Sequence, residues 1–274
     1  MSAVTEPRMA DDSFHMIESG ESDMTIEPLA LVAYCDGFLD ASRFADYAPN
    51  GLQVEGDRPI RRLVSGVTAC AALIDAALDR DADALLVHHG WVWKNENPCL
   101  TGIKGRRART LLSAGVSLIA YHLPLDAHPE VGNNATLGDW LGFVETEPTA
   151  IANGLVWVGR LPVPLSPPAL ADAVSRRLGR QATRVGPDRR SIERIAWCTG
   201  GGQGYLEQAA ALGVDAFLSG ELSEQTTHQA REVGLCYLAA GHHATERYGV
   251  QALGSHLADR FKLLHEFVEI DNPA

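Results

Sequence analysis

The chain has 274 residues, of which 46% are hydrophobic and 21% charged, and its formal net charge is −12. This composition is typical of a soluble globular protein with one large domain or two modest ones. The acidic balance argues against a nucleic-acid-binding surface, which needs a basic stripe, but it is compatible with metal cations. The sequence has no apolar run long enough to span a membrane and no signal-peptide pattern. Its five cysteines are scattered without CxxC spacing, so we expect reduced thiols and a cytoplasmic protein.

Residues 1–26 are acidic and lack apolar periodicity, which predicts a disordered tail. From residue 27 onward, predicted strands and helices alternate along the chain. The strands are expected at Leu63–Val67, Ala84–Val87, Val116–Tyr121, Ile192–Cys198, Val214–Ser219 and Leu235–Ala240. The helices are expected at Pro28–Leu39, Ala71–Leu78, Arg106–Ser113, Asn133–Leu141, Pro167–Leu178, Tyr205–Leu212, Ser223–Val233 and Thr245–Phe261.

This alternation predicts an α/β architecture with parallel sheet pairs. Two pairs of segments also resemble each other. ADALLVHHG (82–90) lines up with VDAFLSGEL (214–222), and AGVSLIAYHLPLD (114–126) with VGLCYLAAGHHATE (233–246). The similarity indicates a duplicated unit, although short α/β repeats also resemble one another by chance. We therefore expect two pseudo-repeated lobes, residues 27–147 and 148–274, with a C-terminal helix able to pack back on the first.

Histidines and carboxylates follow the ends of several predicted strands. They are His88, His89, His122, Asp126, His242 and Glu246. In open α/β sheets, ligand sites collect at the carboxyl ends of strands, so we expect these side chains to converge. They offer more donors than one four-coordinate zinc ion needs, which suits two divalent cations. Imidazoles with carboxylates favour Zn, Mn, Fe or Co over Ca or Mg.

Each part of this set has a structural alternative. The adjacent histidines by themselves could form a polar surface turn. The histidine–aspartate pair of the first half could be a polar cluster at a strand end, where Pro124 argues against an α-helix. The histidine–glutamate pair of the second half could hydrogen-bond along a helix face. The equivalent positions of these groups in the two halves favour metal binding.

Two further segments carry weaker signals. TGGGQGY (199–205) lies between a strand and a helix and could cradle a phosphate with its backbone N–H groups. It lacks the lysine of a P-loop, so a tight strand-to-helix turn is favoured. Trp91 and Trp93 could form a lid or stacking platform, or they could anchor the core.

Five segments, in order along the chain after residue 27, carry a family resemblance. They are NGLQVEG (50–56), VHHGWVWK (87–94), YHLPLDAHPEVGNNATL (121–137), SGELSEQTTHQARE (219–232) and GHHATERYGVQALG (241–254). These segments resemble the NIF-three-like family, whose members carry the name GTP cyclohydrolase 1 type 2 homologue. The segments HLPLDAH and HHATERYG are most similar in sequence to the short bacterial members of the YbgI type. Longer relatives insert a separate domain between the halves, and this chain is too short for one.

The resemblance implies two interlinked α/β lobes, with a dinuclear metal centre between them at the C-terminal ends of strands. It also implies toroidal oligomers, often hexamers. The metal ligands that it implies are His88, His89, Asp126, His242 and Glu246. In this pattern Glu246 bridges the two cations and His122 lies close to them, available as a sixth ligand. Glu221 and His228 match polar positions that line the cavity around the metals.

We expect the two cations to serve hydrolysis, because they lower the pKa of a bound water and supply hydroxide. No side chain is therefore predicted as the catalytic group. The resemblance implies a GTP cyclohydrolase-type opening of the guanine ring, or a reaction on a related small molecule. The alternative is a non-enzymatic metal-binding protein, either a metal carrier or a metal-dependent binder of another protein. The expected partners are a small-molecule substrate such as a nucleotide and further copies of the chain, without nucleic acid or membrane.

Overall fold

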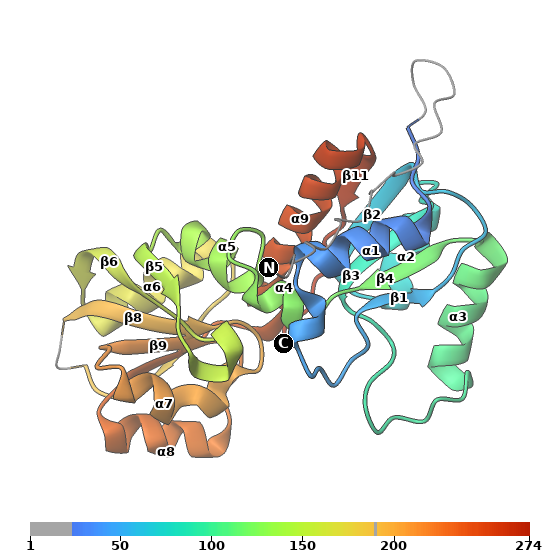
Figure 1. Cartoon of the computed structure of the whole chain (residues 1–274). Coiled ribbons are helices and arrows are strands. Elements are labelled where there is room, and N and C mark those ends of the chain that lie inside the picture. Colours follow the sequence, from blue (N-terminus) through green and yellow to red (C-terminus); the bar gives the residue numbers. More distant parts are fainter. Residues whose placement is uncertain (1–23, 189–190) are drawn as a thin grey trace, which may run out of the picture.

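The computed structural model describes residues 24–188 and 191–274, which form two α/β lobes side by side (Figure 1). The first lobe has a sheet of order β1-β4-β3-β2-β11, and the second has a sheet of order β5-β6-β8-β9-β10-β7. The strands of the first sheet are β1 (Gly51–Val54), β2 (Arg62–Thr68), β3 (Ala84–His89), β4 (Ser117–Ala120) and β11 (Leu264–Phe267). Those of the second are β5 (Val144–Pro148), β6 (Trp157–Leu165), β7 (Thr183–Val185), β8 (Ile192–Cys198), β9 (Ala216–Ser219) and β10 (Cys236–Ala239).

Helices flank both sheets (Figure 1). Within the described residues the α-helices are α1 (Pro28–Phe38), α2 (Ala71–Leu78), α3 (Gly102–Ala114), α4 (Leu123–Ala127), α5 (Asn133–Leu141), α6 (Pro167–Leu178), α7 (Leu206–Ala211), α8 (Glu224–Val233) and α9 (His242–Phe261). The predicted α/β class is therefore confirmed. No helix in the described parts of the chain is long and apolar enough to cross a bilayer.

The two lobes share a repeated unit. In each, three parallel strands alternate with two helices, β2-α2-β3-α3-β4 in the first lobe and β8-α7-β9-α8-β10 in the second. An antiparallel strand flanks each unit in the sheet, β1 beside β4 and β7 beside β10. Asp83 and Asp215 precede equivalent strands, and the Oδ2 of each accepts two backbone N–H groups from the start of the preceding strand at 2.8–3.0 Å. The same local hydrogen bonds in both lobes support a pseudo-repeat.

Two helices interlink the lobes. α5 contributes Ala135 and Leu137 to the core of the second lobe. In the other direction, α9 contributes Val250, Leu253 and Leu257 to the core of the first lobe, and β11 then joins the first sheet beside β2. The C-terminal helix thus packs on the first lobe. The division of the chain at residue 147 stays a prediction.

Several local features differ from the sequence-based expectations. The expectation that Pro124 prevents a helix is wrong, because Leu123–Ala127 forms α4. Pro124 lies in the first helical turn, where backbone N–H groups have no partner within the helix, so its missing N–H costs little. The end of β6 contains two prolines, Pro162 and Pro164, which fall where the pairing with β8 shifts register. Proline is tolerated in strands at such irregularities.

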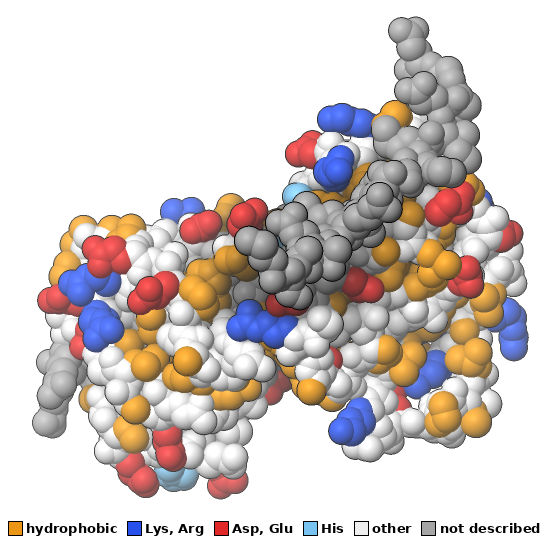
Figure 2. Space-filling view, in the orientation of Figure 1, with side chains coloured by type: hydrophobic (Ala, Val, Ile, Leu, Met, Phe, Trp, Pro, Cys, Tyr) orange, Lys and Arg blue, Asp and Glu red, His pale blue; other side chains and the backbone are white. Residues whose placement is uncertain are grey.

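The chain ahead of α1 is described only in part. Of the residues predicted as a disordered tail, residues 1–23 lie outside the described part of the chain. Ile26 forms an antiparallel bridge with Ile60, so ordered pairing begins just before residue 27. On the face shown in Figure 2, acidic and basic side chains are interspersed and form no basic stripe.

Candidate metal centre

The predicted site residues come from strand ends and helix starts that face one another between the lobes. β3 ends in His88 and His89, and β4 is followed by His122 and then by α4, which carries Asp126. α9 begins at His242, separated from the end of β10 by two residues, and carries Glu246 one turn later. The structure brings these side chains into three groups whose potential ligand atoms lie within 4.8 Å of one another. The groups are His88–His89–His122, His89–His242–Glu246 and His88–Asp126–Glu246.

Glu246 belongs to two of these groups and lies close to three of the histidines. Its Oε2 is 3.2 Å from Nε2 of His89 and 3.1 Å from Nε2 of His242. Its Oε1 is 3.6 Å from Nε2 of His88, and that nitrogen is also 3.5 Å from Oδ1 of Asp126. The two carboxylate oxygens therefore face different imidazoles, which is the arrangement that a carboxylate needs to contact two cations.

Each of the four imidazoles has a hydrogen-bond partner at Nδ1. This leaves Nε2 as the ring nitrogen available to bind a metal. The Nδ1 partners lie at 2.7–3.2 Å and are the carbonyl of Tyr121 for His88, the hydroxyl of Thr68 for His89, and the carboxylates of Asp46 and Glu221 for His122 and His242. A carbonyl or carboxylate only accepts hydrogen bonds, so Nδ1 carries the proton in three of these rings. In its neutral form each of those rings then presents an unprotonated Nε2, the state that binds a metal.

A buried amide holds Asp126. Asn133 donates from Nδ2 to Oδ1 of Asp126 at 2.8 Å, and its own Oδ1 accepts the backbone N–H of Gly249 at 2.9 Å. Thr199 donates to the same Oδ1 of Asp126 at 3.3 Å. These contacts tie α4, α5 and α9 together and fix the carboxylate in the centre.

The glycine-rich segment forms the predicted tight turn between β8 and α7, in which Gly202–Tyr205 is a 3-10 helix. Gly200 has a φ of 59°, and a Cβ built there would lie 1.9 Å from Oε1 of Glu246. Only glycine allows this close approach. The turn thus closes one side of the site.

Burial and charge act in opposite directions on the titration of the site. Burial lowers the pKa of His88, but Asp126 and Glu246 outweigh it and raise that pKa to about 9. Burial likewise lowers and Glu246 raises the pKa of His242, with a net rise to about 9. Burial lowers the pKa of His89 to about 3, assisted by the neighbouring imidazoles. Burial opposes ionisation of Glu246, but His88 and His89 hold its pKa well below its usual range.

The donor set fits a metal ion. Among the described residues, Nε2 of His88 and Oε2 of Glu246 are buried and lack a hydrogen bond of normal geometry. Buried polar atoms without a partner are rare and destabilising. A divalent cation would satisfy both atoms, and the mixed imidazole and carboxylate donors suit Zn, Mn, Fe or Co. The structure therefore shows groups that could hold a metal ion.

The other sequence-predicted residues have different positions. His122 belongs to the cluster. Glu221 lies at its edge and contacts Nδ1 of His242, another member. His228 lies exposed on α8, and no contact within the described residues links it to the cluster. Trp91 is buried and donates from Nε1 to the carbonyl of Ala69 at 2.7 Å, so it anchors the core. Trp93 packs its ring beside His89 and His122, at centroid distances of 5.7 and 5.4 Å.

Several supporting residues were not predicted from the sequence. They are Asp46, Tyr47, Thr68, Asn133 and Thr199, all of which contact a site side chain. Asn133 was predicted only as the start of a helix, and Thr199 only as part of the glycine-rich turn. Asp46, Tyr47 and Thr68 lie in a loop or at a strand end without a recognisable pattern. Two asparagines in succession at a helix start, directly after a candidate ligand segment, were the one available signal.

A search of protein-family models places the chain among known proteins. The model described as Duf34/NIF3 (NGG1p interacting factor 3) matches residues 28–273. The chain belongs to this family. A relative from Allochromatium vinosum is 78% identical over 89% of the chain and 96% of its own length, and one from Pseudomonas aeruginosa is 56% identical over 92% and 100%. Both of these are named GTP cyclohydrolase 1 type 2 homolog.

A solved structure of protein ybgI, described as of unknown function, resembles this Duf34/NIF3 chain throughout. Its TM-score is 0.86 at 46% identity, covering 91% of the chain and 100% of ybgI. The expected family and its short YbgI type are thus confirmed.

Proposed function

We propose that this Duf34/NIF3 protein is a hydrolase that depends on two divalent cations. The proposed metal ligands are His88, His89, Asp126, His242 and Glu246, with Glu246 shared between the cations. The observation that carries this proposal is the position of Glu246, whose two oxygens face different histidines within 3.6 Å. Two bound cations would lower the pKa of water and polarise the bond under attack.

The chain's own residues would orient the ligands and handle protons. Asp46 holds Nδ1 of His122 at 2.9 Å, and Nε2 of that ring faces the cluster. We propose His122 either as a sixth ligand or as a group that holds a proton next to the substrate. The hydroxyl of Tyr47 lies 3.4 Å from Nε2 of the same ring. Glu221 orients His242 in the same manner, and His228 stays a candidate for the wider cavity.

The substrate that we propose is GTP or a related small molecule. The names of the relatives from A. vinosum and P. aeruginosa support a reaction of the GTP cyclohydrolase type. A cavity of about 500 Å³ beside His89 and His242 supports a ligand of that general size. We also propose a toroidal hexamer, from the family resemblance, and a cytoplasmic location, in line with the five free cysteines.

The second candidate function is that of a non-enzymatic metal-binding protein. The side chain of His242 is 29% exposed, so a cation bound there would be accessible from one side. An accessible ligand favours exchange with another protein. A carrier would exchange its metal readily and show no turnover, whereas an enzyme would keep its metal during turnover.

The test is to determine the metal content of the purified protein and then screen it for hydrolysis. Protein loaded with Zn, Mn, Fe or Co would be incubated with GTP, other nucleotides and small amides, and products would be followed by mass spectrometry. We expect close to two metals per chain and a hydrolysed product with at least one metal. The carrier function would be favoured if the protein binds two metals, exchanges them rapidly with solution and forms no product from any compound.

A further inference from the structure

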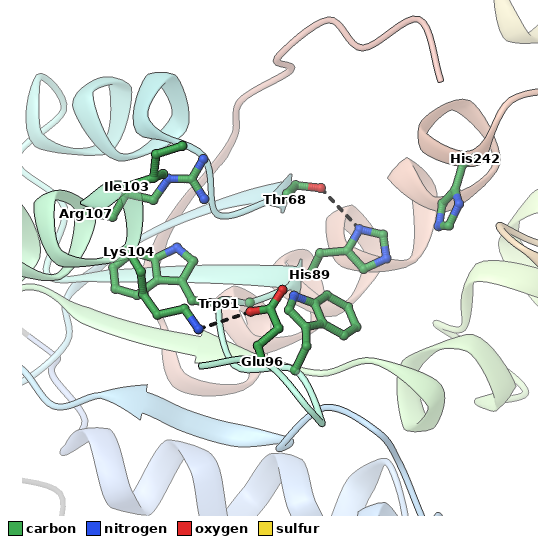
Figure 3. A pocket seen from close by; sticks show the side chains of 10 residues that line it. Thr68, His89, Trp91, Glu96, Ile103, Lys104, Arg107 and His242 are labelled. Atoms are coloured by element: carbon green, nitrogen blue, oxygen red, sulfur yellow. Dashed lines mark hydrogen bonds and ion pairs between the residues drawn. The ribbon is translucent and has the colours of Figure 1, made fainter. Parts of the chain in front are cut away.

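The cavity next to the metal centre has a second end, formed by α3. His89 and His242 line one end, and Lys104 and Arg107 of α3 line the other (Figure 3). Trp93 and Glu96, from the loop between β3 and α3, form part of the wall. A molecule that occupies this cavity would therefore contact the metal ligands and the two basic side chains of α3 at the same time.

Arg107 is the unusual member of this wall. Within residues 24–188 and 191–274 its side chain has no hydrogen bond or ion pair, and its Nε is buried. Leaving a buried guanidinium N–H without an acceptor is unfavourable, and for a charged group the cost is larger than for a neutral one. No acceptor for this N–H lies among the described residues, so the arginine is positioned for an acceptor that a bound ligand would supply.

Lys104 adds a second positive charge. Its side chain is only 19% exposed, and its Nζ is 3.1 Å from Glu96 and 3.2 Å from the carbonyl of Asn97. Glu96 is 52% exposed, so this ion pair is partly solvated and contributes little to stability. An incoming anion could replace the carboxylate of Glu96 on the lysine at small cost.

The charge of the cavity contrasts with that of the whole chain. The chain carries a net charge of −12, yet the α3 end of the cavity combines two cationic side chains with one carboxylate. Cations bound at the other end would make the cavity more positive still. Local fields of this kind concentrate ligands of the opposite charge.

The remaining surfaces limit the shape of the ligand. Trp93 presents an indole next to His89, and this wall suits a flat or apolar part of a ligand. A volume of about 500 Å³ accommodates a small molecule and excludes a folded protein.

We propose that this cavity is the substrate pocket, and that Arg107 with Lys104 binds an oxyanion group of the substrate, a phosphate or a carboxylate. The planar guanidinium suits such a group because it donates two parallel hydrogen bonds to it. The rest of the molecule extends past Trp93 to the side where His89 and His242 lie. The inference rests on the proposed function, since it assigns a pocket to the substrate of that metal centre.

The test measures binding of two probe anions, inorganic pyrophosphate and malonate, to the metal-loaded protein by calorimetry. The variants are Arg107→Met, which removes the charge, and Arg107→Lys, which keeps the charge but not the paired donors. Arg109→Met is the matched control, because Arg109 is exposed on the same helix and does not line the cavity. Thermal melting and metal analysis of each variant show that it is folded and loaded.

We expect at least one probe to bind the wild-type protein saturably. Arg107→Met should weaken that binding by roughly tenfold or more, since a hydrogen bond to a charged group is lost. Arg107→Lys should weaken it less, and Arg109→Met should leave it within about twofold. Stronger binding of pyrophosphate would identify a phosphate-bearing substrate, and stronger binding of malonate a carboxylate-bearing one.

Two results would overturn the inference. One is that neither probe binds the wild-type protein, and the other is that Arg107→Met binds like Arg109→Met. Failure of the proposed function is seen separately, because a protein that takes up no metal fails the metal analysis. In that case the dependence of anion binding on Arg107 still decides whether the α3 end of the cavity binds oxyanions.

Discussion

Glu246 is the residue with the most connections in the candidate metal centre. It is nearly fully buried, and it lies within 3.6 Å of the Nε2 atoms of His88, His89 and His242. A buried carboxylate in this position needs positive charge around it, and imidazolium or metal ions can supply that charge. In the proposed dinuclear site Glu246 would be shared by both cations, whereas each histidine would bind only one.

This difference predicts unequal effects of two substitutions on metal content. Glu246→Gln should lose both metals, because it removes the charge shared by the two cations. His89→Ala should mainly weaken one of them. The measurement is element analysis after dialysis, with Glu224→Gln on the exposed face of α8 as control. Equal metal loss in the Glu246 and His89 variants would show that Glu246 does not bridge.

The titration of the same residues predicts how metal binding depends on pH. His88 and His242 have pKa values raised to about 9, above the ordinary value of 6.5, so both hold a proton at neutral pH. A cation has to displace these protons, and its affinity should therefore rise with pH until about pH 9.

Calorimetry in two buffers of different ionisation enthalpy measures this proton release. Near pH 7 we expect binding to release about two protons per chain, one each from His88 and His242. Near pH 10 the release should be much smaller, because both rings are then already neutral. Metal binding without proton release near pH 7 would show that the metal does not displace protons from these two imidazoles.

At the scale of elements, the site depends on the contact between α5 and α9. Asn133 at the start of α5 accepts the backbone N–H of Gly249 on α9 and donates to Asp126 on α4. Because α5 packs on the core of the second lobe and α9 on that of the first, this contact couples both cores to the metal centre.

Gly249 allows the close approach of the two helices. A Cβ added there would lie 2.4 Å from Oδ1 and 2.8 Å from the backbone nitrogen of Asn133. We expect Gly249→Ala to lower the free energy of unfolding by about 1–3 kcal/mol, as overpacking does in other cores. It should also weaken metal binding through Asp126.

Urea denaturation and metal analysis measure both effects. Gly204→Ala is the control, since Gly204 has no heavy atom within 4 Å of an added Cβ and its φ is not positive. If the Gly249 variant unfolds at the same urea concentration as the wild-type protein, the helices are less tightly coupled than the contact suggests.

At the scale of the whole molecule, assembly is the main open prediction. Val144 on β5 and Val163 on β6 are 41% and 65% exposed, and a groove beside them is lined by apolar side chains. Exposed apolar surface of this kind commonly marks a contact with another chain. We therefore propose this surface as a contact in the hexamer that the family resemblance implies.

Sedimentation analysis should therefore give a mass of about six times 29.5 kDa. The sequence of residues 1–23 has no apolar periodicity, so a variant without them should keep that mass. A monomer at micromolar concentration would contradict the ring and would favour the carrier function, because an open site can dock against a protein partner. Dissociation only after removal of residues 1–23 would assign assembly to that segment.

Much of the fold was predictable because its signals are local. Strands such as Ile192–Cys198 and helices such as Asn133–Leu141 follow from apolar runs, caps and glycine stops, and the structure has them with the same bounds. The strands β1, β5, β6, β7 and β11 were missed. β1, β7 and β11 pair with strands that are distant in sequence, so no local pattern indicates them. β5 pairs with the neighbouring β6, but most of its residues are exposed and β6 contains two prolines, so hydrophobic periodicity indicates neither strand.

The sequence alone determined which residue types lie at strand ends and that two halves of the chain carry them at matching places. These properties depend on the order of residues and on hydrophobic periodicity, which are local. Only the tertiary structure decided that Asp46, Thr68 and Asn133 hold the site side chains, and that Arg107 shares a cavity with His89. The reason is physical: hydrogen bonds and cavities join segments far apart in the chain, and their geometry exists only after α5 and α9 have packed across the two lobes.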